Sequence, residues 1–527
     1  MLGGSMGYSQ SRSAGFNAFR KKALSNYQDF RERILEHYAD FLNGEWHEFE
    51  AIMEEESPYT EPKPKTLPVY EAQLDTMVTN TMIPLPEPMN SDKFTSSDIL
   101  DKAIKGALKK KRFTPSDAEG KSNYERAAMR IPDPDFAFGP FPGQIEAPRP
   151  EVAGMSNTDG NKAPTTDSFH FDFYGMDAFI PEVDFTIADI VPSIEDTGKH
   201  WQNMAQQKGS IETARQLFGL AQQLGLNGYL TLRLTESYVN QKFRNSDQKA
   251  RMSAIHYLMS NMGYDIRLAH LGDIFTVMMP FDQNKVFGLV NYTLDGRRYT
   301  MIMPEGMETP KTVSFYTCQL PTGELGKTSD LRLTGLNLPM MEKPFEVTKN
   351  GITIKGIVND NIRKLLHRYP QMPTGDFASS WIDKQLRDDI VKQVKAQVEG
   401  MSETQAVNTL MSFCHYGFDY STDQDYHGFE KPYFLEENLI YDKNDCEDRA
   451  IFFSYLVWNA LGIPCQLLQY PGHESVSTAV DSAIDGFYYD TEGSKYYSSD
   501  PTYCGSRIGQ IMNRYRNTAP VIDKQYH

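Results

Sequence analysis

Cysteine and long hydrophobic runs are both scarce in this sequence. Five cysteines occur in 527 residues, and their spacing gives no disulfide framework. No apolar run reaches the length of about 18 residues that a membrane-spanning helix requires. Residues 1–7 lack the charged and apolar regions of a signal peptide. An expression remnant that replaced a signal would look the same, so the sequence leaves the compartment open.

Basic residues are also few. The 53 Lys and Arg face 70 Asp and Glu, which gives a net charge of −17 at pH 7. Such an excess of negative charge argues against non-specific nucleic-acid binding and against docking on anionic lipid. The dense basic cluster at residues 109–112 is predicted to be a solvated surface. We therefore expect no nucleic-acid partner, and no pattern in the sequence points to a cofactor.

Proline, by contrast, is abundant in one part of the chain. Residues 51–165 hold 15 of the 30 prolines. Chains rich in proline and charge bury too little apolar surface to fold compactly. The sequence predicts a partly disordered linker over residues 56–165, interrupted by a short helix near residues 96–111.

Aromatic residues recur every eleven positions in the N-terminal segment. The repeating positions are Phe16 and Phe19, Tyr27 and Phe30, Tyr38 and Phe41, and then Phe49. A period of eleven corresponds to about 3.67 residues per turn, typical of a nearly straight helix with one apolar stripe. We expect an amphipathic helix over residues 12–55. Its stripe should pack on the body of the protein, on a second copy of the chain, or on a protein partner.

A mixed helical and β region is predicted over residues 166–370. Helices are expected at about 196–207, 210–224, 228–243 and 247–262, the last with Ser246 as its N-cap. Strands are expected at 266–270 and 274–279, with hairpins at Asp295-Gly296 and Asn350-Gly351. No separate catalytic group is found here. The region is interpreted as a scaffold or a substrate-recognition platform.

The most informative stretch is residues 442–450, which place Cys446 at the start of a well-marked helix. Asp445 is a natural N-cap, and Asp448 follows in a capping-box position. An apolar run over residues 451–461 continues the helix, and Gly462 and Pro464 end it. Free N–H groups and the helix dipole favour a thiolate in the first turn. Cys446 is therefore the candidate nucleophile.

A base and a group to orient it follow in order. His473 lies after a predicted strand at 465–470, and Asp500 ends another strand at 495–499. Antiparallel pairing would bring His473 and Asp500 side by side, with His473 facing Cys446. The predicted roles are nucleophile, general acid–base and orienter of the imidazole.

Three motifs carry a resemblance to a known family: the Asp-Cys-Glu-Asp helix start at 445–448, the Tyr-Pro-Gly-His turn at 470–473 and the Asp-Pro-Thr-Tyr strand end at 500–503. They resemble the catalytic core of the transglutaminase-like superfamily. The resemblance covers about residues 410–504, within a predicted domain at 371–527, and is closest to a bacterial group with long N-terminal regions. It implies a papain-like α+β core and a Cys446–His473–Asp500 triad without a metal or cofactor. In such sequences we expect the histidine almost directly before the next strand, but here Glu474 and Ser475 intervene before the expected strand at 476–480.

Several alternatives stay open. Asp490 competes with Asp500 as the orienter, and His415 or Tyr416 lies near the place of an oxyanion donor. The aromatic-rich loop at 421–443 is interpreted either as a substrate wall or as a cover over the core. Cys318, Cys414 and Cys465 are predicted to be buried apolar residues. A metal site is also conceivable, and its candidate ligands are Asp442, Asp445, Glu447 and Asp448.

The expected fold is thus a multi-domain α+β protein with its catalytic core at the C-terminus. The expected activity is thiol-dependent processing of amide bonds in a protein or peptide substrate. A cysteine protease or amidase is favoured over a cross-linking enzyme. The alternative is a catalytically inactive transglutaminase-like domain in a structural or assembly protein. The aromatic helix and the proline-rich arm suit that second interpretation.

Overall fold

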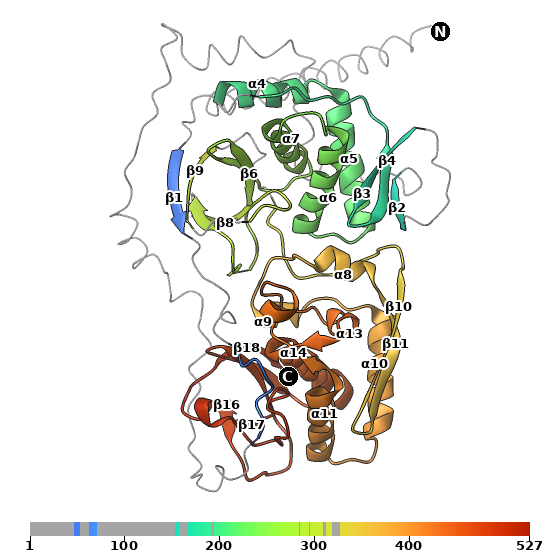
Figure 1. Cartoon of the computed structure of the whole chain (residues 1–527), viewed down its shortest axis with the longest axis vertical. Coiled ribbons are helices and arrows are strands. Elements are labelled where there is room, and N and C mark those ends of the chain that lie inside the picture. Colours follow the sequence, from blue (N-terminus) through green and yellow to red (C-terminus); the bar gives the residue numbers. More distant parts are fainter. Residues whose placement is uncertain are drawn as a thin grey trace, which may run out of the picture.

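A computed structural model of the chain shows a mixed α and β protein with two lobes (Figure 1). The structure describes residues 47–52, 63–70, 153–157, 167–190, 194–283, 285–294, 296–308, 312–318 and 327–527. The upper lobe in Figure 1 contains most of the described residues before about 340, and the lower lobe contains the other described residues. The largest hydrophobic cluster includes side chains from both lobes, so they share one core.

The upper lobe is built on an antiparallel six-stranded sheet with the order β1-β9-β5-β6-β8-β7. One of its hairpins joins residues 291–294 to 297–302, as the sequence predicts, and Gly296 adopts the positive φ angle that a tight turn needs. The strands are β1 (His47–Ile52), β5 (Arg267–Leu271), β6 (Ile274–Met279), β7 (Asn291–Leu294), β8 (Arg297–Ile302) and β9 (Thr312–Cys318).

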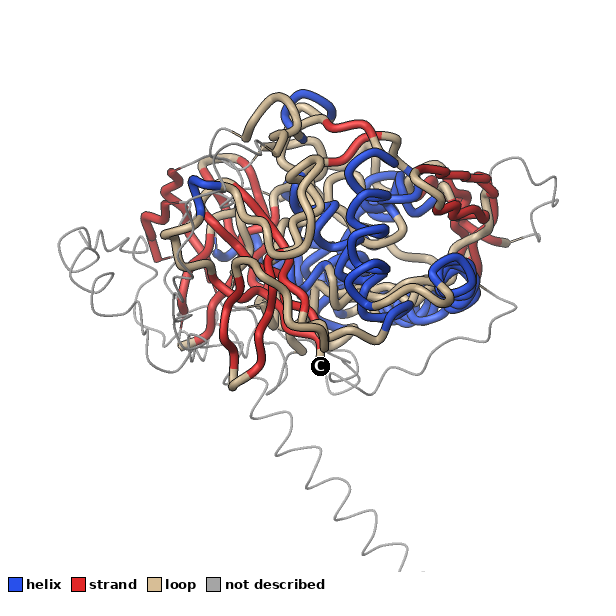
Figure 2. The backbone as a smooth tube through the Cα atoms, turned by 90° about the horizontal axis from the view of Figure 1, so that it is seen from below, coloured by secondary structure: helices blue, strands red, loops and turns tan. Residues whose placement is uncertain are grey.

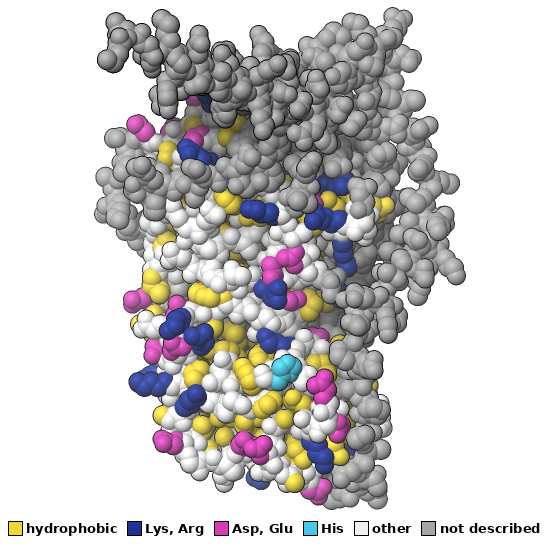
Figure 3. Space-filling model, turned by 180° about the vertical axis from the view of Figure 1, so that it is seen from behind, with side chains coloured by type: hydrophobic (Ala, Val, Ile, Leu, Met, Phe, Trp, Pro, Cys, Tyr) yellow, Lys and Arg dark blue, Asp and Glu magenta, His cyan; other side chains and the backbone are white. Residues whose placement is uncertain are grey.

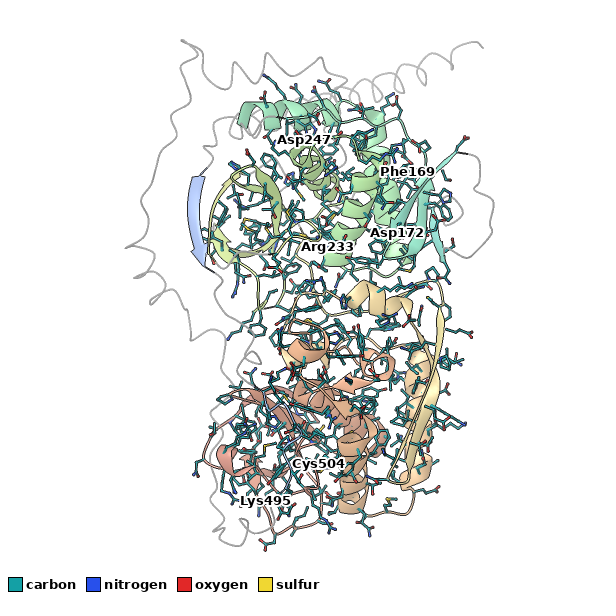
Figure 4. The ribbon with its side chains drawn as sticks, viewed as in Figure 1. Phe169, Asp172, Arg233, Asp247, Lys495 and Cys504 are labelled. Atoms are coloured by element: carbon teal, nitrogen blue, oxygen red, sulfur yellow. The ribbon has the colours of Figure 1, made fainter. Side chains whose placement is uncertain are left out.

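Four helices of the upper lobe lie within two or three residues of their predicted bounds. They are α4 (Ile194–Ala205), α5 (Lys208–Gln223), α6 (Gly228–Lys242) and α7 (Gln248–Asn261). The expected cap of the last helix is wrong by one residue. Asp247, not Ser246, accepts the hydrogen bond from the Ala250 N–H at 2.6 Å (Figure 4), because a carboxylate satisfies a first-turn N–H strongly.

A small antiparallel sheet with the order β2-β4-β3 lies beside α6. Its strands are β2 (Gly154–Asn157), β3 (Ser168–Phe173) and β4 (Met176–Pro181). The side chain of Gln241 on α6 exchanges two hydrogen bonds with the backbone of Asp172, each 2.8 Å long. Phe169, labelled with Asp172 in Figure 4, packs edge-on against Tyr238 of the same helix. Residues 153–157 are thus part of a sheet, although they fall in the predicted linker.

The lower lobe begins earlier than the predicted boundary at residue 371. The hairpin of β10 (Glu342–Lys349) and β11 (Ile352–Asn359) packs against α10 (Lys384–Val398) and α11 (Glu403–Gly417). A Cβ atom on Gly417 would lie 3.2 Å from Cγ1 of Val347. The hairpin therefore approaches the end of α11 closely. Two short helices, α8 (Asn361–Leu366) and α9 (Thr374–Phe377), follow the hairpin and pack on other elements of the lower lobe, α8 on α13 and α9 on α14 and β18.

The C-terminal half of the lower lobe is a helix on an antiparallel sheet. The sheet has the order β16-β17-β15-β14-β18, and α14 packs on β15 and β14. Its elements are α14 (Cys446–Leu456), β14 (Cys465–Tyr470), β15 (His473–Thr478), β16 (Tyr488–Thr491), β17 (Ser494–Ser498) and β18 (Val521–Tyr526). A π-helical stretch at Val457–Leu461 extends α14 to Gly462, whose φ of 70° ends it as predicted.

Two described segments of the N-terminal region contact different lobes. Residues 47–52 form β1 and pair with β9, with Phe49 opposite Phe315. The helix expected over 12–55 is therefore wrong for these six residues, because the edge of the upper sheet offers them a hydrogen-bonding partner. Residues 12–46 lie outside the described residues. Residues 63–70, in the predicted linker, lie in the lower lobe, where they appear as a second blue segment in Figure 1.

The helices lie between the sheets when the molecule is seen from below (Figure 2). Acidic and basic side chains are interspersed on the face seen from behind (Figure 3), so the negative net charge does not gather on that face. Among the helices that the structure describes, none is long and apolar enough to span a membrane.

Candidate functional site

The N-terminus of α14 holds Cys446 as its first residue, with Asp445 as N-cap. The Asp445 N–H donates to Asp448 Oδ2 at 3.3 Å, which is the reciprocal half of a capping box. Asp448 Oδ1 also accepts from the Tyr433 N–H at 2.8 Å. Asp448 thus fixes both the start of the helix and the loop that covers it. The first-turn N–H of Cys446 has no acceptor within its own helix.

His473 and Asp500 form a buried hydrogen-bonded pair. Nε2 of His473 lies 2.8 Å from Oδ2 of Asp500, and both side chains are almost fully buried. Asp500 Oδ1 accepts from the N–H groups of Thr502 (2.8 Å) and Tyr503 (3.2 Å). Burial alone would raise the pKa of Asp500, but His473, the Thr502 N–H and His415 lower it below its ordinary value. Since Nε2 faces the carboxylate, Nδ1 is the nitrogen left for proton exchange with a nucleophile.

The strand that carries His473 begins earlier than predicted. β15 starts at His473 itself and includes Glu474 and Ser475, whereas the sequence predicts its start at Val476. The turn at Pro471-Gly472 places His473 opposite Tyr470 of β14, and Gly472 takes a φ of 66° there. The two residues after the histidine therefore belong to the ladder, and His473 occupies the first strand position.

The Cys446 thiol donates to Oε2 of Glu447 at 3.0 Å. The residue is 1% exposed. Burial, followed by the charges of Glu447 and Asp445, raises the pKa of the Cys446 thiol well above its ordinary value. The thiol of this conformation is thus protonated and closed to solvent.

A lysine from the N-terminal region occupies the space beside Cys446. Nζ of Lys63 lies 2.8 Å from Glu430 Oε1, 2.7 Å from Asp445 Oδ2 and 2.5 Å from Glu447 Oε1. Glu447 therefore contacts both the lysine ammonium and the Cys446 thiol. Burial alone would lower the pKa of Lys63, but Asp445 and Glu447 raise it more strongly, to well above its ordinary value.

More carboxyl groups surround this ion cluster than a single lysine neutralises. Burial, together with the charge of Glu447, raises the pKa of Asp445 to about 7. Burial and the neighbouring carboxylates raise the pKa values of Asp423 and Asp448 well above the ordinary range as well. Part of this cluster is therefore protonated at neutral pH, as is usual when buried like charges meet.

Residues 63–70 are held by the backbone as well as by Lys63. The Cys504 N–H donates to the Pro68 carbonyl, and the Tyr70 N–H donates to the Cys504 carbonyl, both at 2.9 Å. Val69 and Cys504 form a parallel bridge, and Cys504 is labelled in Figure 4. The Tyr70 ring meets the edge of Tyr503, 5.6 Å between centroids. We call residues 63–70 the strap, because they reach from the nucleophile to the segment that follows Asp500.

The oxyanion candidates from α11 do not face the thiol. His415 Nε2 lies 3.1 Å from the carbonyl of Asp500, and the Gly505 N–H points at its Nδ1. The Nε2–H therefore donates, and His415 anchors the backbone of the orienter. Tyr416 is 46% exposed. The Cys446 N–H is the remaining oxyanion candidate.

Two supporting residues carry no motif in the sequence. The Tyr515 ring stacks on His473 with centroids 5.2 Å apart and planes 6° from parallel. Arg449, fully buried on α14, donates to Asn444 Oδ1 and to the carbonyls of Phe418 and His415. Only its position one turn after Cys446 hints at this, because a buried arginine must be satisfied by many acceptors.

The structure places Asp490 and Asp442 away from the site, whereas Asp445, Glu447 and Asp448 lie in one cluster of carboxyl groups. Asp490 accepts from the Gly493 N–H in a turn and is not bonded to His473. Asp442 accepts from the Tyr426 hydroxyl at 2.6 Å, apart from the other candidate metal ligands. Asp445 and Asp448 have ligand atoms close to those of Asp423. Cys414 and Cys465 are buried thiols as predicted, whereas the side chain of Cys318 lies outside the described ones.

Comparisons with known proteins add little to this geometry. No family model and no curated protein matches the sequence. A crystal structure of a provisionally assigned protease from Parabacteroides distasonis is similar over 47% of this chain and 62% of that chain. The sequence identity is 12% and the TM-score is 0.16. The match spans less than two thirds of that protein, and a likeness this low carries no argument about activity.

Proposed function

We propose that this protein processes amide bonds through Cys446, His473 and Asp500, as a cysteine protease or amidase. The observation that carries the proposal is the buried pair of His473 and Asp500, 2.8 Å apart, on the strand against which the Cys446 helix packs. The resemblance to the transglutaminase-like superfamily supports the same assignment. In this proposal the papain-like core comprises α14 and the sheet of β14, β15 and β17.

The proposed reaction assigns one role to each of these groups. Nδ1 of His473 takes the proton of the Cys446 thiol, and the thiolate attacks the substrate carbonyl carbon. The Cys446 N–H donates to the oxygen that becomes negative. The C–N bond breaks, the leaving amine takes the proton from His473, and a thioester remains. Water, deprotonated by His473, releases the acid and regenerates the thiol. Asp500 keeps the imidazole oriented throughout.

The resting arrangement requires one change before this chemistry. The thiol now donates to Glu447, and Lys63 fills the space on the other side of that carboxylate. Proton transfer to His473 needs the thiol to leave Glu447. Opening of the strap would supply the room, and it would also let a substrate reach the 1% exposed cysteine.

One observation favours the second candidate, a binding protein without catalysis. The nucleophile is buried by the chain itself, and its thiol donates to the carboxylate of Glu447. A domain that had lost its activity would tolerate this arrangement. In that case the strap would be a permanent part of the fold.

Labelling of Cys446 by iodoacetamide from pH 5 to 9 distinguishes the two functions. Because the thiol is buried, the rate reports the transiently opened state, and peptide mapping separates it from the buried Cys414 and Cys465. The enzyme predicts labelling that persists below pH 7 in the wild type and is lost in His473→Ala. A half-maximal rate near pH 8.5, roughly that of an ordinary thiol, in both proteins would contradict the proposal. Cys446→Ala identifies the labelled site.

A further inference from the structure

The ammonium of Lys63 contacts three carboxylates. A lysine head carries three N–H donors and no acceptor, and three carboxylates, from Glu430, Asp445 and Glu447, lie within 2.8 Å of Nζ. The three come from two separate places, the loop before α13 (Glu437–Ile440) and the start of α14. The fold thus assembles a pocket whose three carboxylates can each accept a hydrogen bond from one alkylammonium group.

The pocket retains acceptor capacity beyond the three contacts. Oδ1 of Asp445 is buried and has no hydrogen-bond partner among the described residues. Asp423 lies in the same group, with a ligand atom near those of Glu430 and Glu447. A neutral side chain in this place would leave several buried carboxyls without a counter-charge, which is costly. The pocket therefore discriminates in favour of a cation.

The strap is bound in the manner of a peptide ligand. Its backbone forms two hydrogen bonds with Cys504, which make one isolated parallel bridge, while one of its side chains, Lys63, enters a pocket. Extended peptides are recognised in a similar way, with affinity from main-chain pairing and specificity from a side-chain pocket. Val69 of the strap is 67% exposed, so the strap lies on the surface and only its lysine is deeply buried.

Two of the three pocket residues are also the sequence neighbours of Cys446. Asp445 precedes and Glu447 follows Cys446, and Glu447 contacts both the lysine and the thiol. A side chain bound here lies next to the reacting sulfur. We propose that the pocket of Glu430, Asp445 and Glu447 binds a lysine side chain of a peptide substrate, and that the strap occupies it as an internal ligand. The word substrate rests on the function proposed above, whereas the pocket itself does not.

A substrate lysine would also maintain the charge of the site. If the strap leaves and nothing replaces Lys63, the carboxylates around Cys446 lose their cation. A substrate that brings its own ammonium restores it, so exchange of one lysine for another conserves the buried charge. An uncharged substrate would leave these carboxylates without a cation, so it would displace the strap less readily than a substrate with a lysine. This is the physical reason to expect selectivity for lysine.

The first test uses the full chain with Lys63→Ala, which removes Cγ, Cδ, Cε and Nζ and leaves room for n-propylammonium. The midpoint of thermal unfolding is measured against n-propylammonium, n-propanol, sodium and calcium chlorides. We expect a saturable increase with n-propylammonium in the variant and none in the wild type. Equal rescue by n-propanol, stronger rescue by calcium, or an equal response of the wild type would overturn the lysine pocket.

A second test remains informative if Lys63→Ala does not fold. The milder Lys63→Gln keeps amide donors in the pocket and weakens the strap. Peptides that copy residues 60–70 are titrated against it, one intact, one with Lys63→Met and one with Lys65→Met. Lys65 is exposed, so its replacement is the matched control. We expect the loss of the Lys63 ammonium to weaken binding about tenfold or more, as for a buried charge-assisted contact, and the control peptide to bind like the intact one. Equal binding of all three would refute the proposal.

The lysine pocket and the proposed enzymatic activity can be refuted independently of each other. Rescue by n-propylammonium should be the same when Cys446→Ala is added to Lys63→Ala, because the neutral thiol, which donates to Glu447, offers the ammonium neither a negative charge nor a strong acceptor. If labelling of Cys446 shows an ordinary thiol while rescue persists, the enzyme is refuted and the pocket stands. If labelling supports the enzyme and rescue is absent, the activity stands and the lysine pocket is refuted.

Discussion

The two lobes bury ionisable groups in opposite ways. In the upper lobe, burial lowers the pKa values of His200 and His256 to about 4, and both are neutral. In the lower lobe, carboxyl groups, a lysine and the His473–Asp500 pair are buried together around α14. The upper lobe buries charge in separate pairs such as Arg233 and Glu236, whereas the lower lobe concentrates several buried charges around one helix. Buried charge costs stability unless it is paired, so this contrast marks the lower lobe as the place where function opposes stability.

The largest expected effect breaks the charge balance of the lower lobe. Lys63→Met should lower the free energy of unfolding by about 3–5 kcal/mol, because it leaves buried carboxylates without their cation. Urea unfolding measures the loss. Lys65→Met is the matched control and should change stability by no more than about 0.5 kcal/mol, as for other exposed positions. Similar losses in the two variants would mean that the ion cluster is not formed.

A histidine from each lobe tests whether the contrast is functional. His473→Ala should slow the labelling of Cys446 at pH 6.5 about a hundredfold, since a positioned base contributes at least that much. His256→Gln removes an equally buried histidine, whose Nε2 bonds the Ile266 carbonyl. It should leave the labelling rate unchanged at a temperature where the variant is folded. Equal slowing in both would indicate a general effect of packing.

The pH dependence of stability should have opposite signs in the two lobes. Asp445 has its pKa raised from 3.8 to about 7 in the folded protein. The folded state therefore binds more protons than the unfolded state between these values, and stability falls as pH rises through this window. Asp445→Asn, which keeps an N-cap side chain, should remove up to about 1.4 kcal/mol per pH unit of that slope. An unchanged slope in unfolding from pH 4 to 7 would contradict the raised pKa.

The upper lobe supplies the opposite slope. His256 has its pKa lowered from 6.5 to about 4, so the unfolded state binds more protons in this window and stability rises with pH. His256→Gln should reduce the rise of stability with pH between about pH 4 and 6.5. It should leave the fall of stability that Asp445 causes unchanged. Hydrogen exchange of α7 and α14, followed from pH 4 to 7, assigns each slope to its lobe. Parallel responses of the two helices would remove the contrast.

The smallest effect concerns the support of His473. Tyr515→Leu removes the stacked ring and the hydrogen bond of its hydroxyl to the Pro471 carbonyl, 3.2 Å long. We expect a loss of about 0.5–1.5 kcal/mol for the ring contact and slower labelling of Cys446. Tyr515→Phe keeps the ring and should retain the labelling rate. If both variants label like the wild type, Tyr515 does not position the imidazole.

Sequence patterns predict some helices and strands of this protein accurately and others less so. The helices α5 to α7 and strand β6 follow from apolar periodicity and turn residues, which act over a few positions. The strand at His473 was placed too late, because Glu474 and Ser475 read as polar although both are buried in the sheet. The sequence predicts helix where the structure has β1, because Phe49 continues the eleven-residue aromatic spacing, whereas the pairing with β9 is not a local signal.

The sequence by itself determined which residues carry the chemistry. The cap at Asp445, the apolar run and Gly462 define the helix that begins at Cys446, and the strand ends place His473 and Asp500, because these signals are local. Only the tertiary structure decided what touches the thiol. Lys63 is 384 positions from Glu447, and no local pattern links a lysine in a proline-rich stretch to a distant helix N-terminus. Their pairing arises because the fold brings together buried carboxylates that require a cation, and the strap supplies it.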